Sequence, residues 1–207
     1  MEHKKIVVGI TGGIGSGKSF VANILRNSGF KVFDCDKEAK ELMVSNQMVI
    51  NDILNVVGKE AYIFNVGKDG NENVSLNKTL IADFLFRNSQ NAHVINNIVH
   101  PRLAEYFREW TKLCEEDVVF MESAILFESG FDKLTDFTLL VYADTELRVR
   151  RCIDRDKSNN QDVLKRIKMQ MDQGLLINMA DFMVINNEGD ELDSQLDEFL
   201  KFIRDNN

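Results

Sequence analysis

The feature that most constrains the fold is a glycine-rich segment near the N-terminus. Residues 12–19 read Gly-Gly-Ile-Gly-Ser-Gly-Lys-Ser, which matches G-x-x-x-x-G-K-[ST] at every fixed position. The segment follows an apolar, β-branched run and precedes a helical pattern, which is the context that a phosphate-binding loop requires. Glycines let backbone N–H groups turn towards phosphate oxygens, and the following helix adds the positive end of its dipole. The pattern therefore predicts a site for a nucleotide.

Two side chains of this phosphate loop (residues 12–19) have predicted roles. Lys18 is expected to reach the β- and γ-phosphates, and the Ser19 hydroxyl is expected to ligate Mg²⁺. The backbone of the loop supplies the remaining contacts to ATP. The alternative is a glycine-rich turn that ends by chance in Lys-Ser, and it leaves the agreement between motif and flanking elements unexplained. The predicted nucleotide-binding residues of the loop are Gly13, Ile14, Gly15, Ser16, Gly17, Lys18 and Ser19.

Short apolar runs alternate with segments of helical spacing along the chain. Buried strands that alternate with helices form a parallel sheet covered on both faces, so we predict an α/β fold of three α/β/α layers with a five-stranded parallel sheet. The stretch after the second strand is too long for one crossover, and its pattern is mostly helical around a Gly/Asn-rich turn at residues 67–73. The predicted strands are Lys5–Ile10, Lys31–Asp34, Val118–Glu122, Phe137–Tyr142 and Phe182–Asn186.

These elements are interpreted as one phosphate-loop kinase domain with two additions. Residues 1–36, 118–145 and 170–207 form its core. Residues 37–117 form a helical insertion over the carboxyl edge of the sheet, suited to binding an acceptor. Residues 146–169 form a basic lid.

Composition excludes several classes of function. The chain has 25 Lys and Arg against 33 Asp and Glu, a net charge of -8, so non-specific nucleic-acid binding is not expected. No apolar run reaches the length that crosses a bilayer, and the lysines before the first strand do not begin a signal peptide. The three cysteines are widely spaced, so neither a disulfide framework nor a zinc site is expected, and the cytoplasm is the predicted location. The sequence sets no oligomeric state.

The phosphate loop alone does not define the reaction, because GTPases, motor ATPases and small-molecule kinases share it. A GTPase needs Asn-Lys-x-Asp to read guanine. Here Asn77-Lys78 lacks the aspartate and lies in the insertion. Motor ATPases are usually larger. A small kinase needs an acceptor-binding insertion, a general base and a mobile basic lid, and the chain has a candidate for each.

Acidic residues end two of the predicted strands, where open α/β sheets place their ligands. In Asp34-Cys35-Asp36, either carboxylate could accept a proton from an acceptor hydroxyl, or an aspartate could cap the next helix. Spacing leaves these alternatives open. Glu122 ends the third strand and is predicted to steer Mg²⁺, the alternative being a solvated strand end.

The predicted lid is basic within an acidic chain. Residues 146–168 hold eight cations and four acids. Cations closed over a triphosphate would neutralise the charge of the transition state, whereas the alternative is a solvated basic helix. The eight cations are Arg148, Arg150, Arg151, Arg155, Lys157, Lys165, Arg166 and Lys168.

Taken in order, these motifs resemble those of the dephospho-coenzyme A kinase family over nearly the whole chain. The phosphate loop with its preceding Thr11 is similar to the loop of that family, and residues 34–36 are similar to its Asp-x-Asp. The other similar segments are Val99-His100-Pro101, Ile125-Leu126-Phe127-Glu128, Arg151 with Arg155-Asp156, Arg166 to Gln170, and Val184 to Gly189.

The resemblance implies transfer of the ATP γ-phosphate to the ribose 3′-hydroxyl of dephospho-coenzyme A, the last step of coenzyme A biosynthesis. It makes Asp36 the general base, with Lys18, Arg151 and Arg155 as further catalytic residues. Phe20 stands where the family often has Thr, and its backbone N–H can still serve the α-phosphate. Asn187 would border the adenine, although Glu188 replaces the second Asn of Asn-Asn-Gly. The implied acceptor contacts are Asp34, Asp36, His100 and Glu128.

Three alternatives stay open at this point. His100 precedes Pro101, so a packing role at the start of a helix is as consistent with the sequence as an acceptor contact. The chain could phosphorylate another acceptor, such as a nucleoside or nucleotide. It could also be a non-catalytic nucleotide-binding regulator, which would need neither Asp36 nor the lid.

Overall fold

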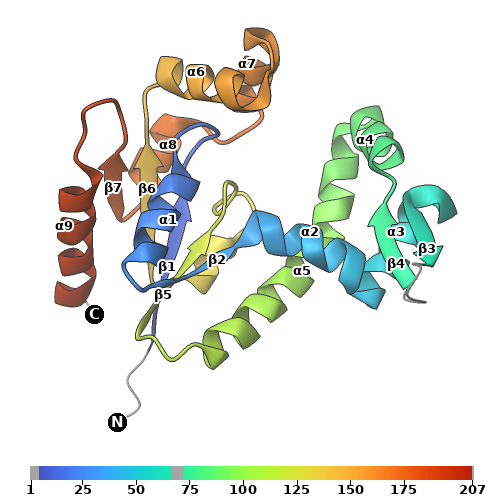
Figure 1. Ribbon diagram of the computed structural model, residues 1–207, viewed down its shortest axis with the longest axis horizontal. Coiled ribbons are helices and arrows are strands. Elements are labelled where there is room, and N and C mark those ends of the chain that lie inside the picture. Colours follow the sequence, from blue (N-terminus) through green and yellow to red (C-terminus); the bar gives the residue numbers. More distant parts are fainter. Residues whose placement is uncertain (1–4, 67–71, 207) are drawn as a thin grey trace. The chain divides into compact units, whose positions relative to one another are not determined.

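The computed structural model describes residues 5–66 and 72–206, which fold into two compact units (Figure 1). The first unit comprises Met1–Asp34 and Thr111–Asn207, and the second comprises Cys35–Trp110.

A five-stranded parallel sheet forms the centre of the first unit. Its strand order is β2-β5-β1-β6-β7, so β1 lies in the middle. The prediction of five parallel strands is confirmed, with ends that differ by one residue at β1 and β7. The strands are β1 (Ile6–Thr11), β2 (Lys31–Asp34), β5 (Val118–Glu122), β6 (Phe137–Tyr142) and β7 (Phe182–Ile185).

Apolar side chains on α1 (Lys18–Asn27) and α9 (Leu192–Asp205) cover the sheet. Leu25 of α1 and Phe199 of α9 belong to the same buried cluster as Ile10 of β1. In α9, Leu192, Leu196, Phe199 and Ile203 are all buried, which is the spacing of one helical face. Burial of this stripe holds the C-terminal helix on the sheet.

The crossover connections run from the centre of the sheet towards both edges. The β1–α1–β2 connection leads to one edge, and the connection from β6 to β7 leads to the other. Because such crossovers are right-handed, connections in opposite directions place their helices on opposite faces of the sheet. The second connection contains α6 (Thr145–Asp156), α7 (Asn160–Lys168) and α8 (Gln173–Met179).

The second unit is mainly helical and has its own buried cluster. Val49, Ile53, Tyr62 and Ile81 belong to this cluster, which draws on helices and on a hairpin. The elements are α2 (Cys35–Ser45), α3 (Gln47–Val57), the 3₁₀ helix η1 (Lys59–Ala61), β3 (Tyr62–Val66), β4 (Glu72–Leu76), α4 (Lys78–Arg87) and α5 (Ser89–Leu113).

The hairpin was missed by the sequence analysis, which treated the insertion as helical around a turn. Strands β3 and β4 pair antiparallel, with Phe64 opposite Val74. Part of the predicted turn, residues 67–71, lies outside the described residues. The mainly apolar run from Tyr62 to Val66 is only five residues long, and periodicity alone does not separate so short a strand from a helical turn.

The alternative of a helix start at Pro101 is wrong, because α5 runs through this proline. Proline removes one backbone hydrogen bond inside a helix. Four side chains spaced by four residues are buried along α5, and this apolar stripe supports the helix on both sides of the proline: Ile95, Val99, Leu103 and Phe107. Within the described part of the chain, no helix has the length and apolar character needed to span a membrane.

Candidate active site

The phosphate loop connects β1 to α1 through a backbone that only glycine adopts easily. Gly15 and Gly17 have φ of 79° and 96°, and Gly17 precedes the first turn of α1. A Cβ atom on Gly17 would lie 2.0 Å from Nδ2 of Asn186. That amide is buried beyond the end of β7 and donates to the Ser16 carbonyl over 2.7 Å. Asn186 thus fixes the orientation of the Ser16 carbonyl in the loop.

Lys18 is nearly buried at the start of α1. Its ammonium group donates to the Gly12 carbonyl over 2.7 Å and, more weakly, to the Gly13 carbonyl over 3.4 Å. These bonds hold the ammonium across the mouth of the loop, where it lies close to any phosphate that the loop amides bind. The lysine therefore has the position that its motif predicts.

Ser19 and Glu122 come together from α1 and the end of β5. The Ser19 hydroxyl donates to Oε1 of Glu122 over 2.8 Å. The second carboxylate oxygen, Oε2, is buried without a hydrogen-bond partner among the described residues. A buried oxygen of this kind costs free energy unless a partner or a cation satisfies it.

This pair of oxygen ligands fits Mg²⁺. Hydroxyl and carboxylate oxygens are the ligands that Mg²⁺ prefers, and it commonly takes one or two carboxylates. Burial raises the pKa of Glu122, the Ser19 hydrogen bond lowers it, and the charge of Asp34 raises it further. A divalent cation would reverse the effect of burial by stabilising the ionised carboxylate. Ser19 and Glu122 are therefore the residues that could hold the metal.

Asp34 ends β2 directly beside Glu122. The register pairs Asp34 with Glu122 across β2 and β5, so two carboxylates lie at one point of the sheet edge. Asp36 and His100 belong to the second unit. Asp36 is exposed in the first turn of α2, and His100 is half-buried on α5, where burial lowers its pKa.

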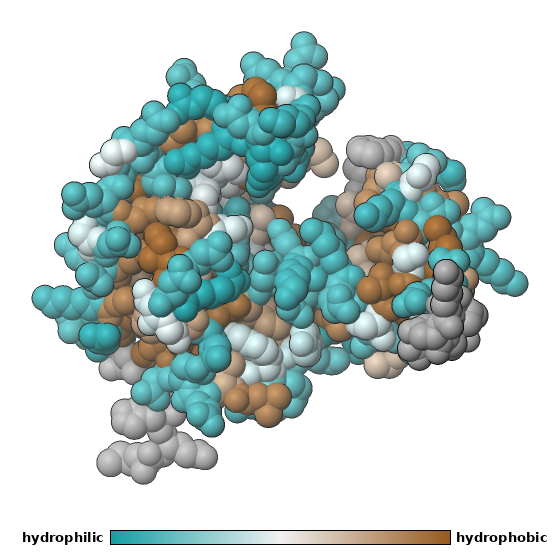
Figure 2. Space-filling view, viewed as in Figure 1, coloured by the Kyte–Doolittle hydropathy of each residue, from teal (hydrophilic) through white to brown (hydrophobic). Residues whose placement is uncertain are grey.

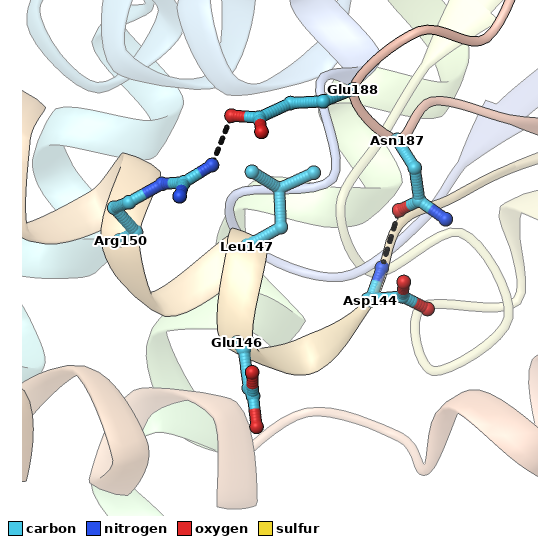
Figure 3. Close-up of a pocket in the computed structure, with 6 residues that line it drawn as sticks. All are labelled: Asp144, Glu146, Leu147, Arg150, Asn187 and Glu188. Atoms are coloured by element: carbon cyan, nitrogen blue, oxygen red, sulfur yellow. Dashed lines mark hydrogen bonds and ion pairs between the residues drawn. The ribbon is translucent and has the colours of Figure 1, made fainter.

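A pocket of about 500 Å³ opens between α6 and the loop after β7 (Figure 3). The Oδ1 atom of Asn187 accepts from the backbone N–H of Asp144 over 2.9 Å and joins that loop to the start of α6. Across the pocket, Arg150 forms an ion pair with Glu188. Glu146 and Leu147 complete the lining. The pocket combines one apolar side chain with carboxylate oxygens, which accept hydrogen bonds from a base with an exocyclic amine.

The surface over α6 and α7 is mainly hydrophilic (Figure 2), and three of its arginines make contacts of two kinds. Arg151 donates to the Ser16 carbonyl of the phosphate loop over 3.4 Å. Arg155 and Arg166 instead share a carboxylate: Asp156 accepts from Arg155 over 2.7 Å and from Arg166 over 2.6 Å. These hydrogen bonds hold the pKa of Asp156 well below its usual range. Asp156 therefore joins α6 to α7 and offsets two of the cations.

Arg148 differs from the other cations of the predicted lid, because it is buried. Its Nε donates to the Ile14 carbonyl over 2.9 Å, and burial lowers its pKa. Glu128, a predicted acceptor contact, is exposed and accepts from the backbone N–H of Met171 over 3.0 Å. Phe20 is 59% exposed in the first turn of α1.

Three residues make contacts with the loop or the arginines that the sequence does not predict. Asn186 ends a predicted strand and lies in a motif similar to the family's, Arg148 is one of the predicted lid cations, and Asp156 lies in another such motif. Their contacts join segments far apart in the chain or on separate helices, so no local pattern reveals them. The one sequence signal for Asn186 is its place as a polar residue directly after an apolar run.

Comparisons with known proteins agree with one another. A family model described as dephospho-CoA kinase matches residues 6–193. The dephospho-CoA kinase of Bacteroides fragilis (strain YCH46) is 40% identical over 199 residues, which cover 96% of this chain and 93% of that protein. The crystal structure of TT1252 from Thermus thermophilus has a TM-score of 0.77 at 28% identity, covering 98% of this chain and 97% of that one. The dephospho-CoA kinase from Campylobacter jejuni gives 0.62 at 24% identity over 96% and 95%, which supports the fold alone.

Proposed function

Because the chain belongs to the dephospho-CoA kinase family, we propose that it phosphorylates the ribose 3′-hydroxyl of dephospho-CoA with ATP, the last step of coenzyme A biosynthesis. The observation that carries the proposal is the Ser19–Glu122 pair next to Lys18, where the end of β5 meets the start of α1 beside the phosphate loop. This arrangement provides a site for ATP and Mg²⁺, as in other phosphate-loop proteins, and the family match over residues 6–193 points to the acceptor.

In the proposed reaction, the acceptor oxygen attacks the γ-phosphorus and the bond from that phosphorus to the β–γ bridging oxygen breaks. Asp36 takes the proton of the acceptor hydroxyl, and ADP leaves. Lys18 and the loop amides stabilise the charge on the transferring group. Asp34, beside Glu122, orients the acceptor or water around the metal.

The remaining predicted residues bind the metal, the nucleotide or the acceptor. Ser19 and Glu122 would hold Mg²⁺, which neutralises phosphate charge when bound. Asn187 and its pocket receive the adenine, and the backbone of Phe20 serves the α-phosphate. Arg151 and Arg155 act from the lid segment (residues 146–169). The second unit, with His100, and the exposed Glu128 contact the acceptor. The three cysteines are free thiols, and the proposed location is the cytoplasm.

Acceptor-dependent ADP release tests the proposal. The purified chain is assayed with ATP and Mg²⁺ against dephospho-CoA, adenosine, AMP and shikimate, and the product is identified by its mass gain of one phosphoryl group. We expect turnover with dephospho-CoA alone. Lys18→Met, which keeps the apolar stem, should lower kcat by about 10²- to 10³-fold. The matched control is Lys201→Met on the exposed face of α9, which should leave kcat unchanged.

Two outcomes contradict the proposal. Faster turnover with adenosine or AMP would identify a kinase for a different acceptor. ATP binding without turnover on any acceptor would identify a nucleotide-binding regulator.

A further inference from the structure

We propose that Arg148 and Gln170 are positioning residues that fix the Ile14 peptide groups of the phosphate loop and connect that loop to the lid segment. This inference rests on the proposed function. Both residues lie outside the phosphate loop, at the start and just beyond the end of the lid segment. Neither is expected to touch the reacting atoms, so each acts through the loop.

Arg148 holds the loop from its carbonyl side. Its Nε donates to the Ile14 carbonyl over 2.9 Å, and its Nη1 donates to Oε1 of Gln173 at the start of α8. The side chain of Gln173 donates in turn to the Ala143 carbonyl over 3.2 Å. Arg148 is only 3% exposed, so this chain of hydrogen bonds is shielded from water.

The loop and Arg148 are in close contact. A Cβ atom on Gly13 would lie 2.0 Å from Nη2 of Arg148, and a Cβ atom on Gly15 would lie 2.4 Å from the carbonyl oxygen of Arg148. The two glycines are therefore needed for this contact as well as for the curvature of the loop. An arginine that packs so closely does not belong to a freely moving lid.

Gln170 holds the loop from its amide side. Its Oε1 accepts from the backbone N–H of Ile14 over 2.7 Å. The carbonyl of the same peptide group, that of Gly13, accepts from the Ser16 N–H over 3.0 Å. This peptide group is therefore bonded at both ends.

These contacts determine where the phosphate-binding amides point. A peptide group is planar and trans, so its carbonyl and its N–H point in opposite directions. With the Ile14 carbonyl directed to Arg148, the Gly15 N–H must point away from Arg148, to the opposite side of the peptide. Asn186 fixes the Ser16–Gly17 peptide in the same way, by donating to the Ser16 carbonyl. Amides held in advance stabilise a phosphate without the cost of reorganisation.

Three variants separate this role from general stability. Gln170→Met removes the acceptor for the Ile14 N–H and keeps the length of the side chain. Arg148→Met removes every donor, and Arg148→Lys keeps one charged donor in place of the fork. The matched controls make the same changes at exposed positions of the first unit, Gln161→Met on α7 and Arg204→Met on α9.

The first measurement is hydrogen exchange of the Ile14 amide by NMR, which reads the contact directly and needs no substrate. We expect Gln170→Met to speed this exchange by at least about 10-fold, and Gln161→Met to leave it unchanged. The second measurement is ADP affinity by calorimetry, expected to weaken about 10- to 100-fold in Gln170→Met and Arg148→Met, and less in Arg148→Lys.

Steady-state kinetics complete the test. A positioning role raises KM for ATP and lowers kcat while KM for dephospho-CoA stays unchanged, which a general loss of stability would not produce. The proposal is overturned if Gln170→Met matches Gln161→Met in both Ile14 exchange and ADP affinity. Because neither readout needs the acceptor, a chain that binds ADP but does not phosphorylate dephospho-CoA would contradict the proposed function only. Arg148 is buried, so thermal unfolding is followed as well, and Gln170→Met decides the case if Arg148→Met does not fold.

Discussion

The Ser19 hydroxyl donates a hydrogen bond to Oε1 of Glu122 over 2.8 Å, across 103 positions of sequence. The bond satisfies one oxygen of a carboxylate that is 6% exposed and leaves the other without a partner among the described residues. Burial raises the pKa of this carboxylate, so its ionised form is disfavoured in the folded chain.

We expect Glu122→Gln to stabilise the fold at neutral pH when no divalent metal is present. A group whose pKa is raised by folding contributes stability below its unfolded pKa and loses that contribution as pH rises through the folded pKa. The wild type should therefore lose stability, relative to Glu122→Gln, from about pH 4.5 upward until the folded pKa is passed. Urea unfolding between pH 4.5 and pH 8 in EDTA measures the difference. Glu198→Gln, on the exposed side of α9, is the control and should show no such trend.

The same substitution should weaken the response to Mg²⁺. A glutamine retains an acceptor for Ser19 but has no charge to attract the cation, so the Mg²⁺ concentration for half-maximal turnover should rise at least about 10-fold. Turnover is measured over a Mg²⁺ titration at fixed ATP. An unchanged midpoint would show that Glu122 is only a buried strand-end carboxylate.

The sheet could be predicted from sequence because its signals are local. Each strand is a short buried run, and the phosphate loop fixes where the first one ends. The predicted ends of β1 and β7 differ from the observed ends by one residue, because hydrogen bonds with neighbouring strands determine where a strand ends. The hairpin of Tyr62–Val66 and Glu72–Leu76 was missed because each of its strands is only five residues long, which is too short to exclude a helix.

The candidate site likewise has residues that the sequence predicts and contacts that it does not. The roles of Lys18 and Ser19 depend on a contiguous motif, so sequence was sufficient to predict them. The contacts of Arg148 with Ile14 and of Asn186 with Ser16 span 134 and 170 positions and depend on how α6 and β7 pack against the loop. A helical face of Arg148, Arg151 and Arg155 looks uniformly basic in sequence, yet one of these residues is buried and another is paired with Asp156.

The base assignment is tested by comparing two asparagine variants. Asp36→Asn keeps size and hydrogen bonding but cannot accept the proton, so kcat should fall by roughly 10²- to 10⁴-fold. ATP affinity should barely change, because the phosphate loop is untouched. Asp34→Asn should lower kcat less, since Asp34 is expected to orient substrate or water around the metal. Both variants are measured with dephospho-CoA at saturating ATP.

The control for this pair is Asp52→Asn, an exposed aspartate on α3 in the same unit as Asp36. It should leave kcat unchanged. A larger loss in Asp34→Asn than in Asp36→Asn would move the role of general base to Asp34.

The last prediction concerns the lid segment and Asp156. Asp156 joins α6 to α7 through Arg155 and Arg166, so Asp156→Asn should speed amide exchange in Asn160–Lys168 several-fold without ligands. ATP analogue plus dephospho-CoA should slow exchange over residues 146–169 in the wild type, because phosphate charge gives the arginines a new partner. Arg155 and Arg166 keep the pKa of Asp156 well below its usual range, so the stabilising effect of its carboxylate is present above that range. The difference in amide protection between Asp156→Asn and the wild type should therefore not vary between pH 5 and pH 8. Asp154→Asn, an exposed neighbour on α6, is the control for hydrogen exchange by mass spectrometry. Equal protection of the segment with and without ligands would show that it is a fixed basic helix pair rather than a lid.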